Sequence, residues 1–347
     1  MDNQSLWGIT TFFNPEHYNN KHSNYRVFRE HSKRQGLNLV TVELAFGNAP
    51  FELTQKDADI LIQIRGTQKN ILWQKERLLH IALSYVPLTC TKIVWLDCDL
   101  IFKNDAWIKE TSEKLDVFFA VQPFEASVRL KKGLQSIDEN TIQFGFLPHQ
   151  KKYSSAYYKA YFKENDVNFA QSNPGYAWAM RRDKIEKIGF YENMIVGGAD
   201  VVMVEGIIGI NVENHFNLNV KMKEDMSNWI QRSQKELQGN VTYTSGTVLH
   251  LWHGSSMNRR YRDRYTILSA YDFDPCQDIT IDSQHLLQWA TNKPNLHKEV
   301  TRYFKLRDEE GAIGLRNIFS MIRNMKYYTH LIIGKVGLYF RSLRRNI

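Results

Sequence analysis

The stretch IVWLDCDLIF, residues 93–102, places two aspartates directly after an apolar run that is typical of a buried strand. Upstream of it, strand-like and helix-like patterns alternate. We predict strands over 6–13, 37–44, 58–64 and 92–96, and helices over 18–35 and 70–85. This alternation predicts an α/β fold with a mixed, mainly parallel sheet flanked by helices. Such sheets bind ligands at the carboxyl ends of their strands, where Asp97 and Asp99 lie.

The downstream pattern is less regular. We predict strands over 116–124 and 175–181, a polar excursion over 126–150, helices over 153–162 and from about Asp200, one or two strands over 240–254, and a largely helical region over 260–306. The chain is therefore divided into an α/β domain at 1–265, a helical C-terminal part at 266–310 that packs on it, and a basic amphipathic tail at 311–347.

The composition is that of a folded globular protein. Hydrophobic residues make up 43% of the 347, which excludes global disorder. No apolar run reaches the roughly 18 residues that a spanning helix needs, and MDNQSLWGITTFF at the N-terminus lacks the features of a secretory signal. The three cysteines show no metal-binding spacing and fit a reducing compartment. We expect a cytoplasmic protein.

Positive charge is concentrated in the tail. Seven Lys and Arg residues and no Asp or Glu follow Gly311, against a formal net charge of +8 for the whole chain. A nucleic-acid enzyme more often spreads its basic surface over the folded body, so we expect no nucleic-acid partner. Basic residues among apolar and aromatic ones, as in IFSMIRNMKYYTHLIIGKVGLYF, favour a helix at the inner surface of a membrane. The alternative is a helix that packs on the body with a solvated basic face.

The two aspartates are candidate metal ligands. On a turn, Asp97 and Asp99 can converge on one hard cation, and Mg²⁺ or Mn²⁺ commonly bridges a protein carboxylate to a diphosphate. The alternative is a solvated turn, in which aspartate is common. The position after a buried strand favours the metal site.

The segment HLWH provides a second set of candidate ligands. His250 and His253 can close on one ion from a turn, and imidazole suits Mn²⁺ and Zn²⁺. Two ordinary histidines at a strand end are the alternative. In the following NRRYRDR, Arg259 and Arg260 are candidates for binding phosphate oxygens, whereas Arg264 fits a solvated helix face equally well.

Two further segments carry charged groups next to these. In GGAD, residues 197–200, Asp200 lies at an expected helix N-terminus, either as a general base for a hydroxyl nucleophile or as a helix cap. In the expected helix over 70–85, Lys75 lies within a mostly apolar stripe. It either extends its amine to solvent or reaches an anion such as a nucleotide.

These segments, in this order, resemble the β-1,4-galactosyltransferase family of GT-A glycosyltransferases. That family has F-N-R-A-K-L-L-N before a D-x-D strand, and here WQKERLLH precedes VWLDCDLIF. The family's G-G-E-D follows a strand of the F-G-G-V type, and here NPGYAWAM leads to VGGAD. Its M-x-x-H corresponds to HLWH. The resemblance spans about 6–265 and is thin between the motifs.

The resemblance implies a metal-dependent, inverting hexosyltransferase that uses a nucleotide sugar, most simply a UDP-sugar. It implies Asp99, His250 and His253 as ligands of Mn²⁺ or Mg²⁺, with Asp97 on the metal and close to the donor, and Asp200 as the general base. Near the donor nucleotide it implies Lys75 and, with less support, Thr10 and Thr11. Arg259 and Arg260 join them as the phosphate-binding candidates named above.

Two departures from the family pattern bear on substrates. Ala199 stands where the family has glutamate, so acceptor recognition cannot be carried over, and His250 replaces a methionine, which leaves the metal preference open. The basic tail, and the lack of the N-terminal anchor that the family's animal members carry, favour polysaccharide biosynthesis on a glycan or lipid-linked acceptor at a membrane. The alternatives are a retaining GT-A enzyme, a nucleotidyltransferase, for which ITTFFNPEH lacks a glycine-rich phosphate loop, and a non-catalytic carbohydrate- or membrane-binding module.

Overall fold

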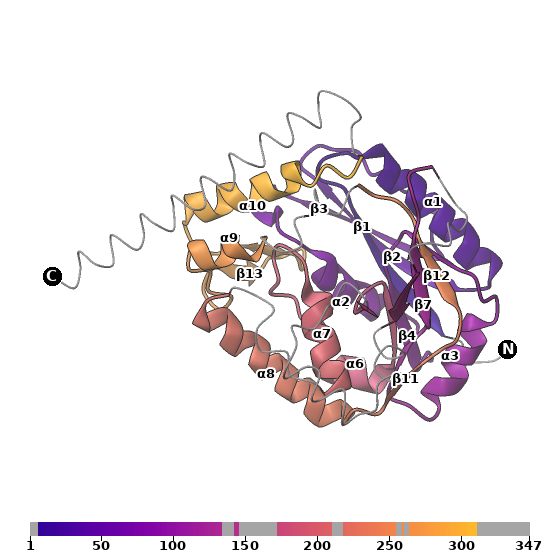
Figure 1. Cartoon of the computed structure of the whole chain (residues 1–347). Coiled ribbons are helices and arrows are strands. Elements are labelled where there is room, and N and C mark those ends of the chain that lie inside the picture. The colour runs from indigo at the N-terminus through magenta and orange to yellow at the C-terminus, as the bar shows by residue number, and fades with distance from the viewer. Residues whose placement is uncertain are drawn as a thin grey trace.

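A computed structural model describes residues 6–133, 142–145, 172–209, 218–254, 259 and 264–310 (Figure 1). Its main sheet has seven strands in the order β11-β6-β10-β4-β1-β2-β3. Their bounds are β1 Trp7–Phe13, β2 Asn38–Phe46, β3 Ile60–Gly66, β4 Lys92–Leu96, β6 Ala120–Gln122, β10 Ala177–Arg181 and β11 Val241–Tyr243. Within this sheet β10 runs antiparallel to both of its neighbours, and the other strands are mutually parallel. The predicted mixed, mainly parallel sheet is confirmed.

Helices cover both faces of this sheet. Their bounds are α1 Asn19–Arg34, α2 Lys75–Tyr85, α3 Trp107–Leu115, α6 Arg182–Ile188, α7 Ala199–Ile208, α8 Val220–Leu237, α9 Tyr265–Ala270 and α10 Pro294–Leu306, with a short 3-10 helix at Gln68–Asn70. Ile93 and Trp95 of β4 pack in the cluster that contains α2, α7 and α8, whereas Val94 and Leu96 pack in the cluster that contains α1 and α3. Because β4 is buried on both faces, it reads as a continuous apolar run.

A second sheet brings two distant segments together at the carboxyl end of β4. Its order is β5-β12-β7-β8-β9, with bounds β5 Leu100–Phe102, β7 Ala126–Arg129, β8 Ile142–Gly145, β9 Ser172–Asn173 and β12 Thr247–His250. Strand β12 pairs antiparallel with β5, so that His250 lies opposite Leu100. This register places the residues after β12 beside the loop between β4 and β5, which contains both aspartates.

Several predicted elements differ from those observed. Helix α2 begins at Lys75 rather than near residue 70. The segment expected to be a polar excursion contains the strands β7 and β8, and the C-terminal part expected to be helical contains, between α9 and α10, a two-stranded sheet of β13 Ile279–Ile281 and β14 Leu287–Trp289. We predicted one or two strands over 240–254, and the structure has two, one on each side of Gly246.

Two predicted segments lie outside the described residues: the helix over 153–162 and the tail over 311–347. Within the described part of the chain, no helix combines the length and the apolar character that crossing a membrane requires.

Candidate active site

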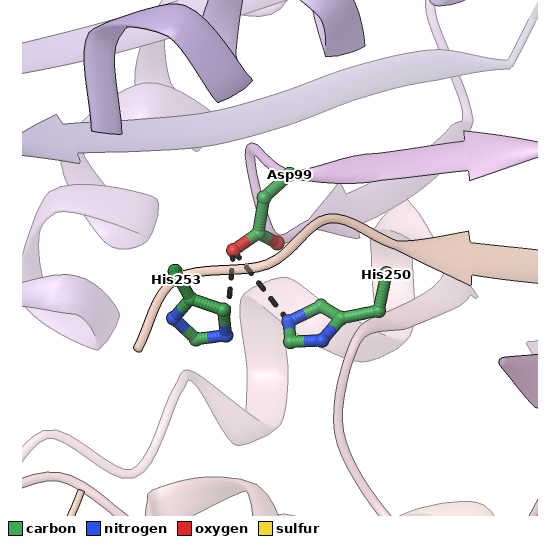
Figure 2. A group of neighbouring side chains, drawn as sticks. All are labelled: Asp99, His250 and His253. Carbon is green, nitrogen blue, oxygen red and sulfur yellow. Dashed lines mark ion pairs between the residues drawn. The ribbon is translucent and has the colours of Figure 1, made fainter. Parts of the chain in front are cut away.

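Three of the predicted metal ligands lie together. The carboxylate of Asp99 points between two imidazole rings, with its Oδ2 atom 3.5 Å from Nε2 of His250 and 3.8 Å from Nε2 of His253 (Figure 2). The backbone N–H of Leu251 donates to the Asp99 carbonyl at 2.9 Å, which fixes the β4–β5 loop against the end of β12. One ligand atom from each residue lies within 4.8 Å of the other two, a spacing that one cation can bridge.

The surroundings of Asp99 and His250 fit a bound cation. Burial lowers the pKa of His250 to about 3, with Arg129 and Arg259 acting in the same direction, so its imidazole is neutral and can act as a ligand. Burial raises the pKa of Asp99 to about 6, although Arg259 acts to lower it. A raised pKa means that the ionised carboxylate has too little positive charge around it, and a bound divalent ion would supply that charge. Among the described residues, the buried Oδ1 atom of Asp99 has no hydrogen-bond partner.

Tyr176 links the aspartate loop to the histidines. Its ring stacks on His250 with centroids 4.5 Å apart, and its carbonyl accepts the backbone N–H of Asp97 at 2.8 Å. Its hydroxyl accepts from Arg129 at 3.1 Å. Tyr176 has φ of 71°, a left-handed conformation that side chains rarely adopt and that tends to occur at functional sites. The preceding Pro-Gly pair is a turn signal in the sequence, but we did not predict a role for the tyrosine.

Asp97 forms an ion pair with Lys75 at the start of α2 and does not belong to the three-residue group that could hold a metal. Burial would lower the pKa of Lys75, but Asp97, Glu76 and Asp200 together raise it, so the amine stays charged. Burial raises the pKa of Asp97 against the attraction of Lys75. Lys75 therefore reaches an anion, as one reading of its helix predicted, and that anion is a protein carboxylate.

Asp200 lies in the same charged cluster. It is the second residue of α7, whose cap position is held by Gly198, so Asp200 is not the helix cap. Its carboxylate lies against Gly175, where a Cβ atom would be only 2.5 Å from Oδ2 of Asp200. Asp200 also contributes to the raised pKa of Tyr265 and of Glu76; the pKa of Glu76 reaches about 8, chiefly through burial.

The glycines before Asp200 allow two side chains to approach closely. A Cβ at Gly198, which has φ of 105°, would lie 2.1 Å from the hydroxyl of Tyr265 and 2.7 Å from Arg264. Arg264 donates to this hydroxyl at 2.7 Å and is buried. The solvated-face reading of Arg264 is therefore wrong: its guanidinium packs against the start of α7.

The residues predicted near the nucleotide differ in their surroundings. Thr10 is fully buried and donates to the carbonyl of Leu96, at 2.7 Å, so it fixes the end of β4; Thr11 is also buried. Arg259 lies beside the metal group, with its NH1 atom 3.1 Å from Nε2 of His253. Arg260 lies outside the described residues.

Two features near the site were missed from the sequence. Lys21 of α1 acts to lower the pKa of Asp99 and of Glu309, and the adjacent Asn20 donates to the backbone carbonyl of Glu309, so the charge of Lys21 lies near the metal group. A pocket also opens at the carboxyl ends of β1 and β2, lined by Phe12, Asn14, Pro15, His17, Glu43, Leu44, Ala45, Phe46, Ala49, Pro50 and Glu52. Phe12 packs with Leu53 and Cys98 in one cluster, so this pocket adjoins the aspartate loop.

Comparisons with known proteins give distant matches. No protein-family model matches the chain, and no curated protein matches its sequence. The chain is similar to the crystal structure of glucosyl-3-phosphoglycerate synthase from Mycobacterium tuberculosis in complex with Mn²⁺, uridine diphosphate and phosphoglyceric acid, at a TM-score of 0.37 and 11% identity over 71% of this chain and 70% of that one.

Two further solved structures are similar at the same level. Staphylococcus aureus TarS 1–349 matches at a TM-score of 0.36 and 11% identity, over 92% of this chain and 78% of that one. The catalytic domain of Drosophila β1,4-galactosyltransferase 7, in complex with xylobiose, matches at 0.29 and 12% identity, over 60% and 63%. TM-scores and identities of this size do not establish membership of a family.

Proposed function

We propose that the protein is a metal-dependent, inverting glycosyltransferase of the GT-A type. It moves a hexose from a nucleotide sugar, in our proposal a UDP-sugar, to a hydroxyl of a glycan or glycolipid acceptor. The observation that supports this proposal is the convergence of the group Asp99, His250 and His253 with the charged cluster of Lys75, Asp97 and Asp200 at one edge of the sheet. Motifs far apart in sequence thereby form one site.

The metal would be held by the three-residue group. Asp99, His250 and His253 supply one carboxylate and two imidazoles, a donor set that suits Mn²⁺ and leaves positions for phosphate oxygens. When bound, the cation would neutralise the charge of the leaving diphosphate. Tyr176 orients the ligand set through its stack on His250 and its hydrogen bond to the backbone of Asp97.

Asp200 is the proposed general base. An inverting transfer needs a carboxylate that accepts the proton of the acceptor hydroxyl as the oxygen attacks the anomeric carbon. Asp200 lies in the first turn of α7, and its charge acts on the buried amine of Lys75. Gly175 lets the Asp200 carboxylate lie against the backbone of the turn before β10.

We propose that the nucleoside of the donor binds at the pocket at the ends of β1 and β2. This pocket offers an aromatic wall, Phe12, and polar groups such as Asn14, His17 and Glu52. It adjoins the aspartate loop through Cys98. A base held there would direct its diphosphate toward Asp99, in keeping with the binding of ligands at the carboxyl ends of parallel strands.

The test is a panel of nucleotide sugars incubated with Mn²⁺ or with EDTA and scored by nucleotide release. We expect nucleotide release in the presence of Mn²⁺ and none in EDTA. Asp200→Asn should lower kcat by about 10²–10⁴-fold. Asp99→Ala should lose Mn²⁺-dependent activity, while Asp105→Asn, an exposed carboxylate beyond β5, serves as the control and should retain it. No release with any donor would favour a non-catalytic module.

The stereochemistry of the product separates the two catalytic alternatives. An inverting enzyme changes the anomeric configuration of the transferred sugar, and a retaining enzyme preserves it. A product with retained configuration, read by proton NMR, would overturn the role of Asp200 as the general base while leaving glycosyl transfer intact. We further propose that the tail over 311–347 brings the enzyme to acceptors at a membrane surface, which binding of the full chain to anionic vesicles would test.

A further inference from the structure

Residues 307–310, which follow α10, form a short segment beside the candidate metal site, and we call it the C-terminal strap. Its end is tied to α1 because the backbone N–H of Asn19 donates to the carboxylate of Glu310. Its middle touches the turn after β12, where a Cβ at Gly254 would lie 2.8 Å from the carbonyl oxygen of Asp308. The strap therefore connects elements on two sides of the metal group.

The strap carries a buried carboxylate that is surrounded by cations. The Glu309 Oε1 atom lies 2.7 Å from NH2 and 2.9 Å from Nε of Arg307, and 3.9 Å from NH1 of Arg259. Burial alone would raise the pKa of Glu309, but Arg307, Lys21 and Arg259 lower it to about 2, so the carboxylate is ionised. The negative charge of Glu309 also raises the pKa of Asp99, which places it within the field of the metal group.

Arg259 contacts the metal group and the strap at the same time. Its NH1 atom lies 3.1 Å from Nε2 of His253, the same nitrogen that faces Asp99. A neutral imidazole nitrogen has one lone pair, so it can accept from Arg259 or bind a metal, but it cannot do both. Metal binding through this atom would therefore turn Arg259 away from His253 and leave its guanidinium to an anion nearby.

We propose that Lys21, Arg259 and Arg307 form an anion site for the diphosphate of the donor, and that Glu309 occupies this site until the donor displaces it. This inference rests on the proposed function. A diphosphate carries several oxygens that suit guanidinium groups. A diphosphate bound to these cations would repel the Glu309 carboxylate, because both are negatively charged. Donor binding must then move the strap.

The test compares Glu309→Gln with the wild-type chain and with Glu310→Gln, a control that removes a charge from the same strap outside the cation cluster. Isothermal titration measures three probes: Mn²⁺ alone, Mn²⁺ with UDP, and inorganic pyrophosphate in EDTA. We expect Glu309→Gln to tighten binding of pyrophosphate and of Mn²⁺–UDP by about tenfold, because a like charge has been removed. The affinity for Mn²⁺ alone should fall by less than about threefold, because Glu309 acts on the metal group only through its field, and Glu310→Gln should change none of the three.

A loss of about tenfold or more in the affinity of Glu309→Gln for Mn²⁺ alone would overturn the proposal, because Glu309 would then be part of the metal site. Unchanged or weaker binding of pyrophosphate would overturn it as well. Pyrophosphate in EDTA needs neither metal nor nucleoside, so a wild-type chain that binds pyrophosphate but not Mn²⁺–UDP would contradict the proposed function and not the anion site. If Glu309→Gln fails to fold, as its melting curve would show, Lys21→Met provides the second variant: it must weaken pyrophosphate binding, and unchanged binding would refute the site.

Discussion

Replacing Gly175 by alanine tests the position of the proposed base without changing any charged residue. The added Cβ would lie 2.5 Å from Oδ2 of Asp200, and ordinary contact begins at 3.4 Å, so the carboxylate would have to retreat by about 0.9 Å. The backbone of Gly175 does not have a positive φ, and the clashing atom is the end of a flexible side chain. The fold should therefore survive, at a cost of about 1–3 kcal/mol in the free energy of unfolding.

The catalytic cost of this displacement should be larger. A misplacement of about 1 Å in a reacting group costs roughly 10²-fold in rate. We expect Gly175→Ala to lower kcat for nucleotide-sugar turnover by about that factor while leaving the affinity for Mn²⁺–UDP unchanged. The assay is steady-state kinetics with Mn²⁺, together with calorimetric titration of Mn²⁺–UDP.

The matched control is Gly66→Ala in β3. Gly66 also lacks a positive φ, and the nearest atoms to its added Cβ are side-chain atoms at 3.2 Å or more, none of them from Lys75, Asp97 or Asp200. This control should retain kcat. A Gly175→Ala enzyme with wild-type kcat, when Asp200→Asn is inactive, would refute the placement of Asp200 against Gly175. Wild-type kcat in both Gly175→Ala and Asp200→Asn would refute the role of Asp200 as the base.

The buried Glu76, the stacked Tyr176 and the ligand His253 each lead to a further prediction. Because burial raises the pKa of Glu76 from 4.5 to about 8, the folded state between these pH values holds a proton that the unfolded state has released, and stability falls as the pH rises, by up to about 1.4 kcal/mol per unit. Glu76→Gln should flatten this fall in melting curves recorded across that range; an unchanged slope would show that Glu76 is ionised in the fold. Tyr176→Ala should lower Mn²⁺ affinity about tenfold, whereas Tyr176→Phe, which keeps the ring stacked on His250, should lower it by less than about threefold; equal losses would argue against the stack. His253→Ala should lower Mn²⁺ affinity by at least about tenfold in calorimetry with UDP, and the exposed His285→Ala should not; equal affinities would exclude His253 as a ligand.

The sheet was predictable because its strands carry strong local signals. Strand β4 is buried on both faces and reads as an unbroken apolar run, and β1 and β2 lie within one or two residues of their predicted bounds. The short strands β13 and β14, three residues each, were not foreseen. Strands so short pair through tertiary context, and a three-residue window shows no periodicity.

The candidate site was predictable only in part, because its groups meet through long-range pairing. The motifs containing Asp99 and His253 could each be identified locally, but the antiparallel pairing of β5 with β12 that joins them leaves no local pattern. The ion pair between Lys75 and Asp97 likewise depends on how α2 packs. No sequence motif marks Lys21, because its relation to Asp99 arises only when α1 packs on the sheet.

The most direct test of the account is the position of Mn²⁺ in crystals of the full chain soaked with Mn²⁺ and UDP. We predict one anomalous peak within ligand distance, about 2.0–2.3 Å, of Asp99, His250 and His253, with the diphosphate on its open side. A well-occupied peak elsewhere, with these three side chains unliganded, would contradict the proposed metal centre and the function built on it.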